Sequence, residues 1–176
     1  MVFLDTALPG AFIIEPECLH DDRGFFARLW SADAFATRGL VARFDHVSVS
    51  FNHRKGTLRG MHYQTAPFAE TKLVRCTRGA IHDVALDLRS DSPTYLKWIA
   101  AELSADNRRT MYVPAGCAHG FQTLTSDAEV MYMIDAPYSP EHAHGVRWND
   151  RAFNITWPDE ERTMNGRDAQ YPDFAR

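Results

Sequence analysis

Residues 58–64 read Leu-Arg-Gly-Met-His-Tyr-Gln, a short strand-like run in which a glycine stands two residues before a histidine. Lys72 lies in the next strand-like run, and the segment 114–121, PAGCAHGF, places His119 just after a glycine turn. Two histidines and a lysine on neighbouring strands, beside glycine turns, are typical of a small β-barrel with a reactive interior. The sequence therefore predicts a functional site inside a β-domain.

Alternation of apolar and polar residues runs through much of the chain and indicates strands. Val84, Leu86 and Leu88 alternate with small or acidic residues, and a second such run lies at 130–134. Further strands are expected at Phe12–Leu19, Phe25–Leu29, Arg43–Phe51, Thr57–Gln64, Thr71–Thr77, Tyr95–Leu103 and Thr110–Val113. About nine or ten short strands separated by turn residues predict an antiparallel sandwich or barrel. Residues 31–38 are the clearest helix, and the tail after residue 158 reads as a loop or short helices.

Length and composition favour a single domain that stays in the cytoplasm. A chain of 176 residues, 45% of them hydrophobic, has the size of one well-cored domain. The net charge of −4 and the scattered basic residues argue against a nucleic-acid partner, so an anionic ligand needs a local basic pocket. We expect no leader peptide and no membrane partner, and three widely spaced cysteines suit reduced thiols.

Strand parity leaves two arrangements of the central residues open. In the first, three polar side chains point into one cavity: His62, Gln64 and Lys72. In the second, that side is solvated and the opposite side, with Met61 and Leu73, is the core. Arg59 has the wrong parity to join His62, so a site that contains both requires a bulge at Gly60.

Several other residues have structural explanations when they are taken alone. A lone histidine such as His119, in a turn that enters a strand, is more often structural than catalytic, although a second histidine on a neighbouring strand gives it weight. Tyr132 lies in mid-strand and is by default a core tyrosine whose hydroxyl finds a partner. The run DRGFF at 22–26 is by itself a turn into a strand. The remaining histidines are expected mostly at the surface: His20, His46, His53, His82, His142 and His144.

With these residues in view, the chain resembles the dTDP-4-dehydrorhamnose 3,5-epimerase family from about residue 9 to residue 168. The matching motifs occur in order: DRGFF (22–26), LRGMHYQ (58–64), KLVRC (72–76), DVALDLRSDSPT (83–94), VPAGCAHGF (113–121), YSP (138–140), RWND (147–150) and ITWP (155–158). The family implies an all-β fold, a cupin-like jelly-roll barrel with a few short helices, as one domain over residues 1–176. It also implies a homodimer that shares an N-terminal strand, and epimerisation of a nucleotide-linked 4-keto-6-deoxyhexose in deoxysugar biosynthesis without a metal or other cofactor.

The resemblance implies a catalytic set of four residues: His62, Lys72, Tyr132 and Asp168. A proton α to a ketone is weakly acidic, so epimerisation needs a base on one face, an acid on the other, and stabilisation of the enolate between them. By resemblance, His62 is the base and Asp168 orients it, which requires the tail 158–176 to fold over the barrel mouth. Lys72 would stabilise the enolate, and Tyr132 would deliver a proton to the opposite face.

The substrate-binding residues also follow from the resemblance. They are Arg23, Phe26, Arg59, Gln64, His119, Tyr138 and Arg167. The three arginines suit a diphosphate, because a guanidinium fork binds phosphate oxygens in pairs, and the two aromatic rings would stack on the base. His119 would orient the site or the substrate.

Two regions depart from the pattern of the family. Arg28 stands where the family has a glutamate that contacts the ligand. The family's Gln-x-Asn pair is replaced by Val47 and Val49, or by His46 and Ser48 after a slip of one residue. These departures leave open which carbon is inverted, C3, C5 or both, and which nucleotide is bound.

Two alternatives to an epimerase remain. A metal-dependent cupin of the Fe(II) dioxygenase kind would use His62, Glu70 and His119 as ligands, because imidazole and carboxylate suit non-haem iron. Against it, Gln64 stands where the second histidine of a His-x-His pair is expected, and Lys72 would bring a cation beside the metal. A barrel that only binds a sugar nucleotide leaves Lys72 without a purpose.

Overall fold

Two antiparallel sheets form the body of the molecule, in accord with the predicted jelly-roll barrel. The computed structural model describes residues 1–175, with thirteen strands and two short helices in that range. The strands are β1 (Val2–Asp5), β2 (Phe12–Glu15), β3 (Cys18–Asp21), β4 (Gly24–Ala27), β5 (His46–Asn52), β6 (Leu58–Gln64), β7 (Lys72–Arg78), β8 (Ala80–Asp87), β9 (Trp98–Ser104), β10 (Thr110–Val113), β11 (Cys117–Thr123), β12 (Ala128–Ile134) and β13 (Ala143–Gly145). The helices are α1 (Ala32–Ala36) and α2 (Gly166–Ala169).

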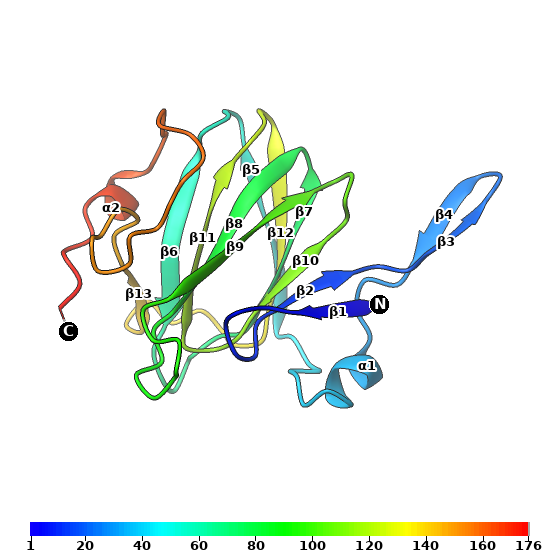
Figure 1. Cartoon of the computed structure of the whole chain (residues 1–176), viewed down its shortest axis with the longest axis horizontal. Coiled ribbons are helices and arrows are strands. Elements are labelled where there is room, and N and C mark those ends of the chain that lie inside the picture. Colours follow the sequence, from blue (N-terminus) through cyan, green and yellow to red (C-terminus); the bar gives the residue numbers. More distant parts are fainter. Residues whose placement is uncertain (176) are drawn as a thin grey trace.

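The strand order shows how distant segments meet. One sheet has the order β1-β2-β10-β7-β12-β5, and the other has the order β13-β6-β11-β8-β9. The two sheets face each other, and the β3–β4 hairpin projects from the body as a separate ribbon (Figure 1). Neighbours in the sheets are therefore mostly not neighbours in the sequence, as expected for a jelly roll.

The predicted elements are confirmed in kind, with three differences. The run expected at Phe12–Leu19 is two strands, because Pro16 removes a backbone donor and interrupts the ladder. β1 and β13 were not predicted as strands, and the strand expected to follow the turn before His119 is β11, which begins at Cys117 so that His119 lies inside it. The predicted helix at 31–38 is shorter, and Ser31 occupies its N-cap position without a side-chain capping bond.

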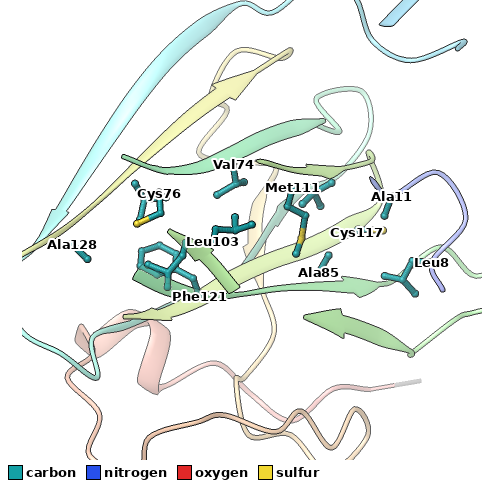
Figure 2. Close-up of a cluster of buried hydrophobic side chains, with 13 residues drawn as sticks. Leu8, Ala11, Val74, Cys76, Ala85, Leu103, Met111, Cys117, Phe121 and Ala128 are labelled. Atoms are coloured by element: carbon teal, nitrogen blue, oxygen red, sulfur yellow. The ribbon is translucent and has the colours of Figure 1, made fainter. Parts of the chain in front are cut away.

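Apolar side chains fill the space between the sheets next to the site. Leu103, Met111 and Phe121 are buried there, together with Cys76 and Cys117 (Figure 2). These side chains come from strands of both sheets, so the cluster fixes the distance between the sheets. Burial of this apolar surface is the main source of stability of such a core.

Both outer faces of the barrel are also partly covered. On the five-stranded sheet, Leu58 and Met61 pack against Trp157 and Phe153 of the C-terminal segment. On the six-stranded sheet, Phe35 of α1 is fully buried in a cluster that also contains Leu73. The core is therefore present on the Met61 and Leu73 side, as the second predicted arrangement requires, but this does not leave the opposite side solvated.

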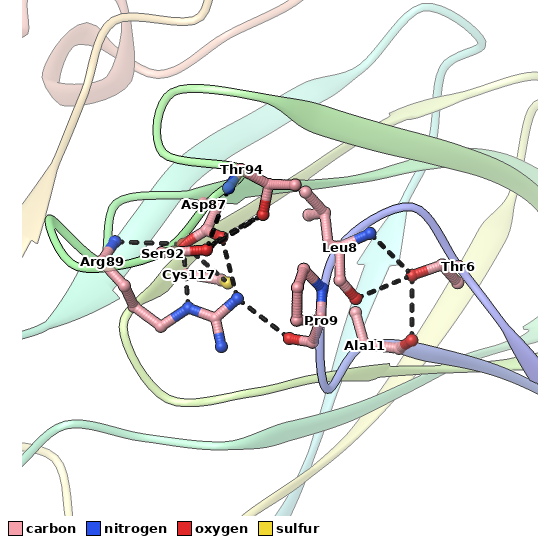
Figure 3. A network of polar contacts seen from close by, with 9 residues as sticks. All are labelled: Thr6, Leu8, Pro9, Ala11, Asp87, Arg89, Ser92, Thr94 and Cys117. Atoms are coloured by element: carbon pink, nitrogen blue, oxygen red, sulfur yellow. Dashed lines mark hydrogen bonds and ion pairs between the residues drawn. The ribbon is translucent and has the colours of Figure 1, made fainter.

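A buried carboxylate fastens one end of the barrel. Asp87 accepts hydrogen bonds from Arg89, Ser92 and Thr94, and Arg89 also donates to the carbonyl oxygen of Pro9 at 2.9 Å (Figure 3). Burial alone would raise the pKa of Asp87, but these hydrogen bonds outweigh it and hold that pKa well below its usual range. The β1–β2 turn is thereby tied to the loop after β8.

Neither helix in residues 1–175 is long and apolar enough to cross a membrane.

Candidate active site

A cavity of about 300 Å³ opens between the two sheets and contains most of the predicted site residues. Eight of its lining residues were candidates from the sequence: Arg59, His62, Gln64, Lys72, His119, Tyr132, Tyr138 and Arg167. The volume lies in the range of small-molecule sites. Three strands supply the central side chains: β6 and β7, which are consecutive in the sequence, and β12, which comes much later.

The predicted irregularity at Gly60 is confirmed. His62 pairs with His119 but Arg59 pairs with Phe121, so β6 has one more residue than β11 in this interval. That bulge turns Arg59 and His62 toward the same cavity, although their spacing would place them on opposite faces of a regular strand. Gly60 has a φ of 133°, and a Cβ atom there would lie 2.5 Å from the Cα atom of Gly120, so only glycine fits.

An imidazole and a carboxylate that are 106 residues apart in the sequence form the first key pair. His62 Nε2 lies 2.8 Å from Asp168 Oδ1, and the backbone N–H of Gly60 donates to Asp168 Oδ2 at 3.1 Å. The Asn165 side chain accepts from the backbone N–H of Asp168 at 2.7 Å, which caps α2 and fixes the position of the carboxylate. The Asp168 side chain is 1% exposed, whereas His62 is 39% exposed.

The electrostatic environment keeps Asp168 ionised. Burial raises its pKa, but the hydrogen bonds from His62 and Gly60 outweigh burial, and the net pKa of Asp168 lies below its usual value. An ionised carboxylate only accepts hydrogen bonds, so His62 Nε2 carries the proton in this pair. Nδ1 of a neutral His62 is then the basic nitrogen.

The first residue of β7 brings a buried ammonium group to the cavity. Lys72 Nζ pairs with Glu70 Oε1 at 2.8 Å and donates to the carbonyl oxygen of His62 at 3.2 Å. Gln64 supports this arrangement, since its amide donates to Glu70 Oε2 at 2.9 Å and accepts from the backbone N–H of Ser139 at 2.7 Å. Lys72 is 8% exposed at its side chain, so its charge is not screened by bulk water.

Tyr132 faces the same cavity from β12, which pairs with β7 in the sheet opposite His62. Its hydroxyl lies 3.3 Å from Ser50 Oγ, and burial raises the pKa of Tyr132 well above the usual value for a phenol. Tyr132 therefore stays protonated and can act as a proton donor. Its ring contacts the imidazole of His119 edge to face, with the ring centroids 6.1 Å apart.

His119 belongs to a second imidazole–carboxylate pair. Its Nε2 lies 2.8 Å from Asp83 Oδ1, and both side chains are almost fully buried. The three ligands that a metal-dependent cupin would need are thus engaged elsewhere: His62 with Asp168, Glu70 with Lys72, and His119 with Asp83. Among residues 1–175, no three histidine, cysteine, aspartate or glutamate side chains form a group that could hold a metal ion.

The candidate nucleotide-binding residues divide into two groups. Arg59, Tyr138 and Arg167 line the cavity, and Arg59 is held there by a hydrogen bond from Nε to Asn52 Oδ1 at 2.7 Å. Arg23 and Phe26 lie on the projecting β3–β4 hairpin, outside the part of the described chain that lines this cavity.

The departures from the family pattern are also placed. Arg28 is exposed next to β4 and lies outside the cavity residues of its own chain. The register Ile134↔His46 and Tyr132↔Ser48 puts His46 and Ser48 on the cavity face of β5, while Val47 and Val49 point outward. His144 is exposed, as predicted, and lines the cavity. His46 is only partly exposed and also lines the cavity, because parity alone did not fix which face of β5 turns inward.

Other residues in the cavity wall or directly behind it had no role in the sequence analysis. Ser50 contacts Tyr132, Asp83 contacts His119, and Tyr63 lines the mouth beside His144. The alternation of polar His46, Ser48 and Ser50 with apolar residues was a signal for the first of these. Asp83 gave no comparable signal, because its partner lies on another strand.

Fold and cavity together define the class: a cupin-like barrel whose interior cavity brings together histidine, lysine and tyrosine side chains. A sequence profile of the dTDP-4-dehydrorhamnose 3,5-epimerase family matches residues 5–176, and the chain therefore belongs to that family. A dTDP-4-dehydrorhamnose 3,5-epimerase of Sinorhizobium fredii is 45% identical over 162 residues, which cover 90% of this chain and 81% of the relative.

Solved structures agree with this assignment. A dTDP-4-dehydrorhamnose 3,5-epimerase of Bacillus anthracis, solved with TDP and pyrophosphate bound, superposes with a TM-score of 0.94 at 41% identity, covering 98% of this chain and 99% of that one. A 3′-monoepimerase of Streptomyces bikiniensis, in complex with dTDP-quinovose, superposes with a TM-score of 0.88 at 32% identity, covering 96% and 85%.

Proposed function

We propose that the chain epimerises a dTDP-linked 4-keto-6-deoxyhexose at C3, C5 or both, as an isomerase of deoxysugar biosynthesis. The observation that carries the proposal is the His62–Asp168 pair, which places an oriented base in the same cavity as Lys72 and Tyr132. The reaction needs a base, a group that stabilises the enolate, and an acid, and these three side chains have the required chemistry.

Proton removal is the role of His62. With Nε2 held by Asp168, Nδ1 takes a proton from the carbon next to the ketone, and the imidazolium that forms is stabilised by the adjacent carboxylate. The electron pair moves into the ketone oxygen and gives an enolate. Asp168 keeps the tautomer fixed and does not itself take the proton.

Lys72 and Tyr132 complete the inversion, and proton exchange with solvent afterwards returns His62 and Tyr132 to their starting states. The ammonium group of Lys72 donates to the enolate oxygen, where one buried donor contributes about 3 kcal/mol to transition-state stabilisation. Tyr132 then gives its phenolic proton to the opposite face of the carbon, which inverts the centre. Its raised pKa suits this role, because the phenol is protonated at neutral pH.

Binding of the nucleotide falls to the cations and rings at the cavity mouth. Arg59 and Arg167 provide guanidinium groups for the diphosphate, and Tyr138, 63% exposed, offers a free ring face to the base. His119 and Gln64 act from the cavity wall by holding Tyr132 and the loop that contains Tyr138, respectively.

The remaining two ligand residues support a homodimer. Arg23 and Phe26 project on the hairpin away from their own barrel, and Phe26 is 69% exposed (Figure 1). In the proposed dimer this hairpin serves the cavity of the partner. Exposed Val47 and Val49 on the outer face of β5 supply apolar surface for the contact.

Complementation between two inactive variants tests the shared site. His62→Ala removes the base of one cavity, and Arg23→Ala removes the donated cation. If the hairpin crosses to the partner, a dimer of one of each contains one intact site, and mixing the unfolded and refolded variants restores activity. Two variants that stay inactive after mixing, with hybrid dimers demonstrated by mass spectrometry, would refute the shared site.

The reaction itself is tested by exchange with solvent deuterium. Incubation with dTDP-4-keto-6-deoxyglucose in deuterated water should label the carbons α to the ketone, and NMR of the product identifies C3, C5 or both. His53→Ala is the matched control, because His53 is 85% exposed at its side chain, outside the cavity residues. Absence of exchange with several nucleotide sugars would refute the epimerase.

Cytoplasmic location is part of the same proposal. The three cysteines, Cys18, Cys76 and Cys117, are free in the described structure, which is the usual state in a reducing compartment. Cell fractionation with antibodies to the chain would test it, and recovery in a secreted or membrane fraction would contradict it.

A further inference from the structure

Gly145, the strand partner of His62, leaves a space beside the proposed base, here called the seat because a ring occupies it. In the β13–β6 ladder, Gly145 is the direct partner of His62. The ring of Tyr171 occupies the place above Gly145, where even a methyl group would overlap ring carbons Cζ and Cε2. Gly145 does not have a positive φ, so its backbone does not demand glycine, and the seat for the ring is the evident reason for this residue.

The seated ring contacts the imidazole of the base. The ring centroids of Tyr171 and His62 are 6.2 Å apart at an interplanar angle of 70°, an edge-to-face arrangement. Tyr171 also lies under the guanidinium group of Arg167, whose Cζ is 5.9 Å from the ring centroid. The ring is therefore held between the strand, the base and a cation of the cavity mouth.

Tyr171 and Asp168 reach the base from one short piece of chain. Asp168 lies in α2, and Tyr171 follows three residues later, so both side chains can approach β6 from the same side. Asp168 contacts the Nε2 atom of His62 and Tyr171 contacts its ring. The two contacts constrain different motions: a hydrogen bond fixes one atom, and a ring contact fixes the plane.

The hydroxyl group of Tyr171 is buried and has no partner of hydrogen-bonding geometry among the described residues. Burial raises the pKa of the phenol and outweighs the nearby guanidinium group of Arg167, which lowers that pKa. The group therefore stays neutral, and the ring supplies the contact. A phenylalanine at this position should keep the geometry.

We propose that Tyr171 is a positioning residue for the base: its ring, seated on Gly145, fixes the plane of the His62 imidazole so that Nε2 meets Asp168 while Nδ1 stays free to take the proton. This inference rests on the proposed role of His62 as the base. Tyr171 is then a second side chain, besides Asp168, that orients the His62 imidazole.

A double-mutant cycle separates positioning from general packing. Tyr171→Ala removes the ring, and Gly145→Ala displaces it from its seat; each should lower kcat about tenfold with KM little changed. Because both act through the same contact, the double variant should be no slower than Tyr171→Ala alone. Tyr171→Phe should stay within about twofold of wild type. Gly166→Ala, with no atom within 4 Å of its added Cβ, is the matched control.

Several outcomes would overturn the inference. Losses that multiply in the double variant mean that the two residues act separately, and an equal loss in Tyr171→Phe assigns the effect to the hydroxyl group. Unchanged kcat in Tyr171→Ala removes the role altogether. If Tyr171→Ala does not fold, Tyr171→Leu and the single Gly145→Ala variant give the same comparison, with thermal unfolding as the measure of folding.

Nitrogen-15 NMR of His62 makes the test independent of turnover. Wild type should show one tautomer, protonated at Nε2, and Tyr171→Ala should show a mixture or exchange broadening. If wild type exchanges no substrate protons but this spectral difference is present, the proposed function fails and the positioning stands. If wild type is active and the spectra are identical, the positioning fails and the function stands.

Discussion

Two imidazole–carboxylate pairs lie at one cavity. They have the same nitrogen–oxygen distance but differ in exposure and in their other hydrogen-bond partners. His62–Asp168 and His119–Asp83 both have an Nε2 to Oδ1 distance of 2.8 Å. The first is built from a strand and the C-terminal segment, and its histidine is 39% exposed; the second is built from β11 and β8, and its histidine is 5% exposed. The same pair of groups is therefore accessible to a ligand in one place and enclosed in the other.

The carboxylates differ as well. Asp168 uses both oxygens, one for His62 and one for the N–H of Gly60, whereas Asp83 Oδ2 is buried with no partner among the described residues. A fully satisfied carboxylate can tolerate a change of charge on its imidazole, which a base undergoes in each turnover. The comparison indicates that accessibility and a complete set of hydrogen-bond partners distinguish the proposed catalytic pair, His62–Asp168, from the structural pair, His119–Asp83.

The largest expected effect separates the two histidines. His62→Ala should lower the rate of deuterium exchange α to the ketone by about 10³-fold or more, because the base is lost. His119→Ala should cost about tenfold in rate but about 3 kcal/mol in the free energy of unfolding, since Asp83 is left buried and unpaired. Exchange rates and urea unfolding measure the two. Equal rate losses in both variants would contradict the division of roles.

The two aspartates should differ in the next comparison. Asp168→Asn keeps the size of the side chain but can donate to Nε2, so it favours the wrong tautomer of His62; we expect kcat to fall about 10²–10³-fold with substrate binding retained. Asp83→Asn should change kcat by less than about tenfold. Single-turnover kinetics on both variants would show the difference, and a larger loss for Asp83→Asn would reverse the assignment.

Acid pH gives a third and smaller distinction. The pKa of Asp168 is lower in the folded state than its ordinary value of about 3.9, so its contribution to stability is present above that value and is lost as the pH falls through the folded pKa. The stability difference between wild type and Asp168→Asn should narrow as the pH falls from about 5 toward 2. Unfolding curves across this range measure it, and a difference that widens in acid would contradict the sign.

The smallest expected effect concerns how each carboxylate is held. Asp83 is fixed by the ladder of β8, but Asp168 depends on the cap of a four-residue helix. Asn165→Ala should therefore cost about 1 kcal/mol of stability and a few-fold in kcat. Thermal unfolding and steady-state kinetics test it, with Gly166→Ala as the control. No change in kcat would mean that the segment holds Asp168 without this cap.

The sequence predicted much of the first strand of the site and little of what surrounds it. Parity on residues 58–64 required a bulge at Gly60, and the register of β6 with β11 confirms it. The bounds of β11 were not predicted, because all its residues are buried and its two faces do not alternate in polarity. The face of β5 was not fixed, since a slip of one residue exchanges His46 and Val47.

Long sequence separation explains what else could not be predicted from local pattern. His62 and Asp168 are 106 residues apart, and only the resemblance to a family pointed to their contact. Tyr171 gave no signal, because the seat that receives it is the missing side chain of Gly145 on another strand. A glycine that makes room for a distant side chain produces no hydrophobic periodicity in the sequence. The packing of the C-terminal segment on the five-stranded sheet decides both contacts.

The chain order of Asp168 sets the timing of activity during translation. Every described strand, through Gly145 at the end of β13, is made before the ribosome reaches Asp168. At roughly 5–20 residues per second, the barrel sequence is complete about 1 to 5 seconds before its acceptor for His62 exists. In the newly synthesised barrel, no carboxylate yet fixes the tautomer of the His62 imidazole. We expect prematurely terminated chains that end before Asp168 to be at least as slow as Asp168→Asn, even where their sheets have already closed.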